Sequence, residues 1–293
     1  MGGSLFNFRP GGGSTARSAK LLASNGDRAG GDLSGENRSR NAGRPEDAPD
    51  QANALTLGQA GDGLMFGSRL LEPLAPALPF QTSPEVADQY RLIRTRIMRH
   101  ALEPQVVLLT SPGQGDGKTV NSINIAAMLS MAKDSDVLLI GGDANGDLNV
   151  QLGLDPELPG LTNVLSGQVR IQRATITTVQ YPNLFILPCG TSPRDMPELL
   201  NSAAWAAVMR YARASFRFVI IDAPPCGLVA DYYLLESASD AVTLVVRPDH
   251  TNRRMLRAAL EEIPRQKFLG VLMNAYHDYF FWRKLDYYGR PWE

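Results

Sequence analysis

Hydrophobic positions along the chain follow two patterns, and both begin near residue 84. Val86, Tyr90, Ile93 and Ile97 recur every three or four residues, which predicts an amphipathic helix starting at Pro84. Short apolar runs then predict buried strands at 105–110, 136–141, 184–188, 217–222, 241–246 and 268–273, and the patterns between them predict helices at 118–133, 197–213 and 251–264. Buried strands that alternate with helices predict an α/β fold, in which a mostly parallel central sheet has helices on both faces.

The segment 1–80 differs in composition from the rest of the chain. It is rich in Gly, Ser, Ala, Asn and Asp, and it has few large apolar residues that could offset the entropy lost on folding. We therefore expect a disordered N-terminal tail at 1–80, an α/β domain at 81–275 and an aromatic C-terminal tail at 276–293. Two apolar islands in the first tail, 5–8 and 64–66, are candidate docking points, although a linker or a tag remnant explains the first equally well.

Composition and charge exclude several kinds of partner and location. The 293 residues carry a net charge of −1, which provides no general attraction to nucleic acid or anionic lipid. No apolar run approaches the roughly 20 residues that span a bilayer, and the N-terminus lacks the apolar core of a signal peptide. Cys189 and Cys226 have no metal-binding spacing, and so few cysteines are typical of a reducing compartment. We expect a cytoplasmic protein without direct membrane insertion, which reaches a membrane only through a partner.

The strongest chemical signal is the segment 111–119, Ser-Pro-Gly-Gln-Gly-Asp-Gly-Lys-Thr, which joins a predicted strand to a predicted helix. In this context a glycine-rich loop wraps its N–H groups around the phosphates of a nucleotide. Lys118 would reach the β- and γ-phosphates, and the Thr119 hydroxyl would bind Mg²⁺. Pro112 stands where the strict pattern has glycine, so the alternative is a glycine-rich turn that merely precedes a lysine. The candidate nucleotide-binding residues are Gly113, Gln114, Gly115, Asp116, Gly117, Lys118, Thr119 and Val120.

Two aspartates follow predicted strands and are candidates for holding the metal. Asp222 ends the apolar run 218–222, and the carboxyl end of a parallel strand borders the crevice in which ligands bind. It is therefore a candidate Walker B acid, which holds Mg²⁺ through water. Asp143 comes just after the run 137–140 and would lie at the same edge. The alternatives are an ordinary strand-end aspartate for Asp222 and a turn residue for Asp143.

Six short motifs in a fixed order resemble the bacterial tyrosine kinases, which are P-loop ATPases of capsule and exopolysaccharide secretion related to the MinD-like ATPases. The likeness covers about residues 82–275. The motifs are the helix with Asp88, Arg91 and Arg94, the loop 110–119, the Pro-Gly-Leu segment 159–167, the segment 187–200, the strand end 220–225 with Asp231, and the strand end 270–274 with Asn274.

The resemblance implies a function, a set of partners and roles for individual residues. It implies an ATP- and Mg²⁺-dependent tyrosine autokinase, activated by a membrane polysaccharide co-polymerase at the inner face of the inner membrane. Lys118, Asp143 and Asp222 would be catalytic, and Asn274 would contact adenine. Asp88, Arg91 and Arg94 would join subunits of a homo-oligomer, although pairing within the helix is the alternative. Tyr276, Tyr279, Tyr287 and Tyr288 would accept phosphate, although a hydrophobic docking strip explains this aromatic tail equally well.

One motif departs from the family. The family's second acidic motif is Asp-x-Asp-x-Arg, and the aligned residues here are Gly141, Asp143 and Asn145, so the first acid is missing. If the strand runs two residues longer, Asp143 takes the first position, with Asn145 and Asp147 behind it. Three functions therefore stay open: an autokinase, a catalytically impaired ATP-binding regulator of the same machinery, and a MinD-like positioning ATPase. The last of these usually has a lysine where this chain has Gly113.

Overall fold

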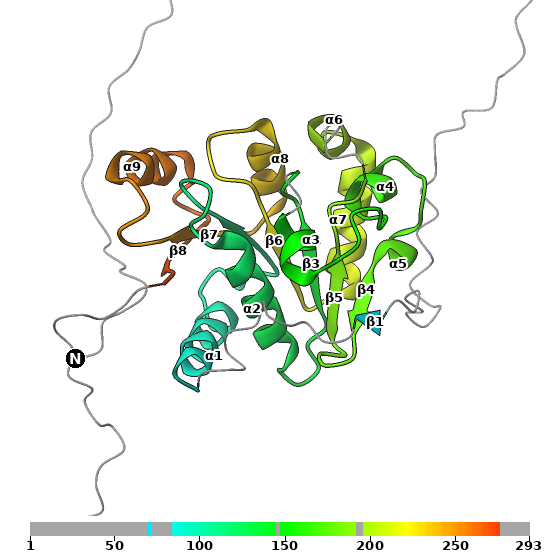
Figure 1. Cartoon of the computed structure of the whole chain (residues 1–293), viewed down its shortest axis with the longest axis horizontal. Coiled ribbons are helices and arrows are strands. Elements are labelled where there is room, and N and C mark those ends of the chain that lie inside the picture. Colours follow the sequence, from blue (N-terminus) through cyan, green and yellow to red (C-terminus); the bar gives the residue numbers. More distant parts are fainter. Residues whose placement is uncertain (1–69, 72–83, 145–146, 192–195, 276–293) are drawn as a thin grey trace, which may run out of the picture. The chain divides into compact units, whose positions relative to one another are not determined.

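The computed structural model describes residues 70–71, 84–144, 147–191 and 196–275 (Figure 1). In these ranges, eight strands form one sheet in the order β1-β4-β5-β3-β6-β2-β7-β8. Neighbouring strands run parallel except for β4 and β5, which pair antiparallel. The strands are β1 Leu70–Leu71, β2 Val106–Thr110, β3 Val137–Gly141, β4 Ile176–Thr178, β5 Leu184–Leu187, β6 Phe218–Asp222, β7 Ala241–Val246 and β8 Phe268–Met273.

Helices cover both faces of this sheet, because alternate residues of the inner strands enter two separate apolar cores. Val107 and Leu109 of β2 pack on one side, and Val106 and Leu108 pack on the other. The first core is closed by α1 Pro84–Met98, α2 Lys118–Ser130 and α3 Asp147–Leu152. The second is closed by α4 Leu161–Leu165, α5 Ile171–Ala174, α6 Met196–Leu200, α7 Ala203–Ser215, α8 Ala230–Ala238 and α9 Arg253–Glu262 (Figure 1). The predicted α/β fold is confirmed.

The predicted elements agree with the structure to within a few residues at each end, with clear exceptions. The helix predicted at 197–213 is two helices, because Ser202 has an extended backbone (φ −112°, ψ 162°) and caps the start of α7. Helix α8, strand β4 and the short helices α3 to α5 were not predicted. Strand β1 lies inside the segment expected to be a tail, and it pairs with Thr177 and Thr178 of β4. The rest of that tail, and the C-terminal tail, lie outside the described residues. No helix in the described ranges combines the length and the apolar character needed to cross a membrane.

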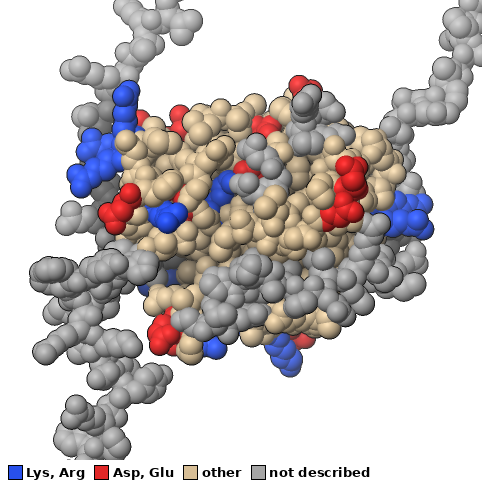
Figure 2. Space-filling model, in the orientation of Figure 1, with Lys and Arg blue, Asp and Glu red and all other residues tan. Residues whose placement is uncertain are grey.

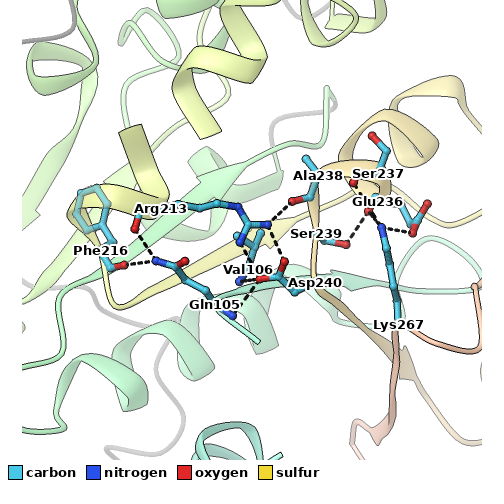
Figure 3. A network of polar contacts seen from close by, with 10 residues as sticks. All are labelled: Gln105, Val106, Arg213, Phe216, Glu236, Ser237, Ala238, Ser239, Asp240 and Lys267. Carbon is cyan, nitrogen blue, oxygen red and sulfur yellow. Dashed lines mark hydrogen bonds and ion pairs between the residues drawn. The ribbon is translucent and has the colours of Figure 1, made fainter. Parts of the chain in front are cut away.

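Asp240 anchors the sheet at the end of the strands opposite the phosphate loop (Figure 3). Its Oδ2 accepts hydrogen bonds from the backbone N–H groups of Gln105 (3.0 Å) and Val106 (2.8 Å), and Arg213 donates to both carboxylate oxygens (2.9 and 2.7 Å). The Gln105 amide donates in turn to the carbonyls of Arg213 and Phe216. Partial burial alone would raise the pKa of Asp240, but these hydrogen bonds and the Arg213 charge lower it. The start of β2 is thereby fixed against β7 and α7.

Candidate functional site: a phosphate loop at the strand ends

The loop 111–117 leaves the carboxyl end of β2 and leads directly into α2. Gly115 and Gly117 have φ angles of 80° and 91°, in the left-handed region that residues with a Cβ rarely adopt. Gly117 is also the N-cap of α2, and a Cβ there would collide with the side-chain amide of Asn274. The glycine spacing therefore shapes a loop whose N–H groups lead into the N-terminus of a buried helix, which is the arrangement that binds phosphate.

Side chains from the segments that follow β7 and β8 hold this loop through Asp116, which is almost fully buried. Thr251 Oγ1 donates a hydrogen bond to Asp116 Oδ1 (2.6 Å), and His250 Nδ1 lies 3.3 Å from the same oxygen. The Gly113 N–H donates to Asp116 Oδ2 (3.1 Å). Asn274 Nδ2 donates to the Asp116 carbonyl (2.9 Å). Asn274 therefore supports the loop in this structure, and its contact with adenine stays a prediction.

Helix α1 supports the loop from the other side, through two buried side chains. Tyr90 donates from its hydroxyl to Asn121 Oδ1 (2.9 Å), and Asn121 Nδ2 donates to the Gly117 carbonyl (2.8 Å). Burial raises the pKa of Tyr90, so its hydroxyl remains a donor at neutral pH. The sequence pattern predicts Tyr90 only as an apolar position of α1, and it does not single out Asn121. A polar residue inside the buried stripe of α2 was the available signal.

Lys118 and Asp143 form a buried ion pair beside the loop. Lys118 Nζ lies 2.7 Å from Asp143 Oδ2, and the two side chains are only 6% and 3% exposed. Asp143 follows the end of β3, and Lys118 is the first residue of α2, so two strand-end segments bring the charges together. A buried ammonium group needs such a partner in the absence of another anion.

Asp222 and Thr119 provide the oxygen atoms expected of a metal site. Asp222 is fully buried at the end of β6, and its Oδ1 accepts a hydrogen bond from Ser122 Oγ (3.1 Å). Its Oδ2 and the Thr119 hydroxyl are also buried, and in the described part of the chain neither makes a hydrogen bond of standard geometry. Burial raises the pKa of Asp222 to about 7, against the opposing effects of the Lys118 charge and of the nearby hydroxyls.

These two oxygens are buried and lie close enough for the Thr119 hydroxyl to affect the pKa of Asp222, and they fit Mg²⁺, which prefers hydroxyl, carboxylate and water ligands. Among the described residues, no group of three or more His, Cys, Asp and Glu side chains could hold a metal ion by itself. Magnesium sites of this kind are completed by the phosphates of a substrate. The arrangement is therefore suited to a metal that arrives together with a nucleotide.

Comparison with known proteins gives the family. The profile described as "AAA domain" matches residues 105–266. The chain is 31% identical over 192 residues to the tyrosine-protein kinase CpsD of Streptococcus pneumoniae, which covers 64% of this chain and 83% of that protein. It is 31% identical over 194 residues to the tyrosine-protein kinase YwqD of Bacillus subtilis, covering 64% and 81%. The chain belongs to the bacterial tyrosine-kinase family. The solved kinase domain of VpsO superposes with a TM-score of 0.59 at 27% identity, over 67% of this chain and 98% of that domain.

Gly141, where the resemblance predicts an acid, is tightly enclosed. Strand β3 ends at Gly141, which pairs with Asp222 of β6. A Cβ on Gly141 would lie 3.0 Å from both the Cys189 backbone nitrogen and Leu148 Cδ2, so an aspartate would have to displace its neighbours. The strand does not continue to residue 143, so the longer strand of the alternative register is not formed. Asp143 nevertheless reaches Lys118 from beyond the strand end.

A further carboxyl group of the family's strand-end motif lies close to this position. Asp231, in the first turn of α8, is buried, and its Oδ1 makes no hydrogen bond among the described residues. Burial raises its pKa, and the charges of Asp143 and Glu198 add to the effect. Asp143 and Asp231 thus bring two carboxyl groups into the region beside the end of β3.

The remaining predicted residues lie apart from the loop or outside the described ranges. Asp88 and Arg91 are exposed on α1 and form an ion pair with each other (2.5 Å), as the intrahelical alternative expects. Arg94 donates to the Met128 carbonyl (3.4 Å), so part of its guanidinium group is used within the subunit. A role of these three residues between subunits stays a prediction. Gln114 is exposed and Val120 is half-buried next to the loop. Tyr276, Tyr279, Tyr287 and Tyr288 lie outside the described residues.

Proposed function

We propose that this protein binds ATP with Mg²⁺ at the loop 111–119 and transfers the γ-phosphoryl group to tyrosine, as an autokinase of exopolysaccharide or capsule export. The observation that carries the proposal is the arrangement around Lys118. The lysine, the left-handed glycines and the two unsatisfied oxygens of Thr119 and Asp222 all converge at the carboxyl ends of β2 and β6. Family membership supports the same reaction.

Each residue of the site has a chemical task in this reaction. The N–H groups of the loop and Lys118 bind the phosphates and stabilise the charge on the transferred group. Thr119 and Asp222 would hold Mg²⁺, and the bound metal would supply neutralisation of phosphate charge. Lys118 exchanges Asp143 for the γ-phosphate, and this frees the Asp143 carboxylate to accept the proton of the tyrosine hydroxyl. The tyrosine oxygen bonds to the γ-phosphorus as the bond from that phosphorus to ADP breaks. Base assistance of this kind contributes about 10²–10⁴-fold to the rate.

A second candidate function is an ATP-binding regulator without phosphotransfer activity. Gly141 favours it, because this position has no acid where the resemblance predicts one, and the neighbouring backbone and Leu148 leave little room for a side chain there. Binding needs only the loop, Lys118, Thr119 and Asp222, all of which are present. The two candidates therefore share the nucleotide site and differ in the fate of the γ-phosphate.

The partners in this proposal follow from the resemblance to the family. They are further copies of this chain, joined through Asp88, Arg91 and Arg94, and a membrane polysaccharide co-polymerase that holds the protein at the inner face of the membrane. The kinase domain is residues 81–275. The kinase domain lies between the N-terminal tail and the C-terminal tail. The C-terminal tail supplies the acceptor tyrosines Tyr276, Tyr279, Tyr287 and Tyr288.

Calorimetry and intact mass together test the proposal. The full-length protein should bind Mg-ADP, and after incubation with Mg-ATP its mass should rise by whole phosphate groups. Lys118→Met should abolish both results, whereas the same change at exposed Lys133 should abolish neither. Binding without a mass increase would favour the regulator. Absence of nucleotide binding by the unmodified chain would refute both functions.

A further inference from the structure

Four arginines gather at the start of α9 without partners in the described residues. Arg247, Arg253, Arg254 and Arg257 are all exposed. Their guanidinium groups take part in no ion pair or hydrogen bond within the described ranges. Figure 2 shows Lys and Arg side chains gathered at the left edge of the molecule, where Figure 1 places α9. We refer to these four residues as the arginine surface.

Helix α9 has basic residues at its N-terminus and acidic residues at its C-terminus, which is the opposite of the arrangement that stabilises a helix. Arg253 and Arg254 are its first two residues, and Glu261 and Glu262 are its last two. The positive end of a helix dipole is its N-terminus, so cations there and anions at the C-terminus are both unfavourable. The start of the helix is well defined, because Asn252 Oδ1 accepts a hydrogen bond from the Arg254 N–H (2.8 Å). The arginine surface therefore does not stabilise the helix, and an anion outside the chain would relieve its repulsion.

This surface borders the phosphate loop. Thr251, two residues before α9, donates a hydrogen bond to Asp116 of the loop (2.6 Å). Within the first turn, the Met255 methyl group lies 3.0 Å from where a Cβ on Gly113 would stand. Arg253, Arg254 and Arg257 fall within an arc of about 100° around the helix, since successive residues are about 100° apart. The buried Ala259 lies away from this arc, so the arginines face solvent beside the loop.

We propose that the arginine surface docks an acidic, tyrosine-containing peptide segment at the rim of the phosphate loop, and so selects acceptor tyrosines flanked by Asp or Glu. The inference rests on the proposed function, since it assigns the substrate class of the same site. Guanidinium groups pair with carboxylates through two parallel hydrogen bonds, and the planar fork suits a peptide with regularly placed acids. In the chain's own segment 276–293, Asp278 precedes Tyr279 and Asp286 precedes Tyr287. The basic residues Arg283, Lys284 and Arg290 balance the three acidic residues of this segment, so the proposed occupant is a more acidic peptide than this segment.

A peptide suits this surface better than an anionic membrane does. Helices that lie in a membrane interface present large apolar side chains next to their cations. The arc that carries the three helix arginines also holds Glu261, and Leu260 lies at its edge beside Arg253. The other large exposed apolar residue of the helix, Met255, lies against Gly113 of the phosphate loop. A single leucine, next to an acid within the arc, is a poor surface for insertion into an anionic membrane. A carboxylate-bearing peptide needs no apolar insertion, so we take the membrane as the outcome that would contradict the proposal.

Fluorescence anisotropy with labelled peptides tests this docking on the full chain in Mg-ADP. The probes are a tyrosine peptide flanked by Asp and Glu and the same peptide with Lys at those positions. The acidic peptide should bind, the basic one should not, and added NaCl should weaken binding. Arg254→Glu with Arg257→Glu should weaken acidic-peptide binding about tenfold or more. The matched control, Arg173→Glu with Arg210→Glu, changes two exposed helix arginines elsewhere by the same charge and should alter it less than about twofold.

The outcomes separate this inference from the proposed function. Normal ADP binding by the variant Arg254→Glu with Arg257→Glu shows that this variant is folded. Arg254→Gln with Arg257→Gln provides a second variant, which removes the charges without reversing them. Equal affinity for both peptides, or no loss in either variant, overturns the inference while leaving the nucleotide site intact. Capture by phosphatidylserine vesicles through the same arginines, without peptide binding, also overturns it. A parent protein that binds no ADP would instead refute the proposed function.

Discussion

Three ionisable residues are buried close together at the phosphate loop, and their interactions decide which of them is charged in the protein without nucleotide. Lys118 is paired with Asp143, and Asp222 is left in a fully buried position whose pKa is raised to about 7. Between about pH 4 and pH 7, Asp222 is therefore protonated in the folded protein. In the unfolded chain, where its pKa is near 3.8, it is already ionised over the same range. Ionised Asp222 thus costs stability, and this cost grows as the pH rises from about 4 to 7.

Asp222→Asn should accordingly stabilise the protein free of metal and nucleotide at pH 8, by about 2 kcal/mol. The gain should shrink toward pH 5, where the parent carboxyl is already protonated. Urea denaturation at both pH values measures it, with the exposed Asp134→Asn as control. The same variant should bind Mg-ATP more weakly, because a metal-holding carboxylate is lost. An equal change in stability at pH 5 and pH 8 would contradict the assignment of the raised pKa.

Single residues differ in how far the sequence could predict them. Lys118, Thr119 and Asp222 were predicted because a local motif and a strand end place them together whatever the rest of the fold does. Thr251, His250 and Asn121 were not, since their roles depend on which strands become neighbours in the sheet. The rule that ligands bind at the carboxyl ends of parallel strands would have pointed to Thr251 and His250 after β7.

At the scale of elements, two consecutive hydrogen bonds link α1 through α2 to the phosphate loop. Tyr90 of α1 holds Asn121 of α2, and Asn121 holds the carbonyl of Gly117. The face of α1 with Asp88 and Arg91 is solvent-exposed in this subunit. Only the side chains of Tyr90 and Asn121 therefore separate the α1 backbone from the phosphate loop, so a shift of α1 can move the Gly117 peptide.

Tyr90→Phe should lower the free energy of unfolding by about 1–2 kcal/mol, because Asn121 Oδ1 is left buried without a donor. It should also weaken ADP binding several-fold, since the Gly117 peptide is held less firmly. Denaturation and calorimetry measure the two effects. Thr95→Ala removes a hydroxyl that bonds to the Arg91 carbonyl on the exposed side of the same helix, and it should change neither quantity appreciably. Unchanged ADP affinity in Tyr90→Phe would limit this hydroxyl to a structural role.

The opposite end of the sheet depends on Asp240, which joins β2, β7 and α7 (Figure 3). Its pKa is lowered in the folded protein, so the stability it provides is present above pH 4 and is lost as the pH falls further. Asp240→Asn should destabilise the protein by about 2 kcal/mol at pH 7 and by much less at pH 3. Thermal melts at the two pH values test this. Asp88→Asn, which breaks an exposed pair, should cost under about 0.5 kcal/mol.

The long apolar strands were predictable because they are buried on both faces, which leaves an unbroken signal. The short elements were not. Strand β4 has three residues, and the break between α6 and α7 depends on the extended backbone of Ser202 rather than on a proline or glycine. Helix α8 follows a proline- and glycine-containing turn, and its nine residues mix apolar and acidic side chains without a clear period.

For the whole molecule, the open question is what the exposed face of α1 contacts. The ion pair of Asp88 with Arg91 can stabilise the helix alone, or Arg91 can bind a second subunit. Exchanging the two residues, Asp88→Arg with Arg91→Asp, keeps a pair on the helix but places each charge at a new position. If subunits meet here, sedimentation should show loss of the oligomer in the exchanged variant, with its melting temperature nearly unchanged. An oligomer that survives the exchange would leave the intrahelical pair as the whole explanation.

The two outermost strands, β1 and β8, hold the first and last strand residues that the structure describes, and the six other strands lie between them. Seven inter-strand spacings of about 4.8 Å separate these edges by roughly 33 Å, less the effect of twist. A donor dye at the β1 edge and an acceptor dye at the β8 edge of one molecule would therefore give the energy transfer expected for this fixed distance within the sheet. In a mixture of molecules that carry only one dye each, any energy transfer would come from neighbouring copies, and it would measure how copies arrange themselves around one another.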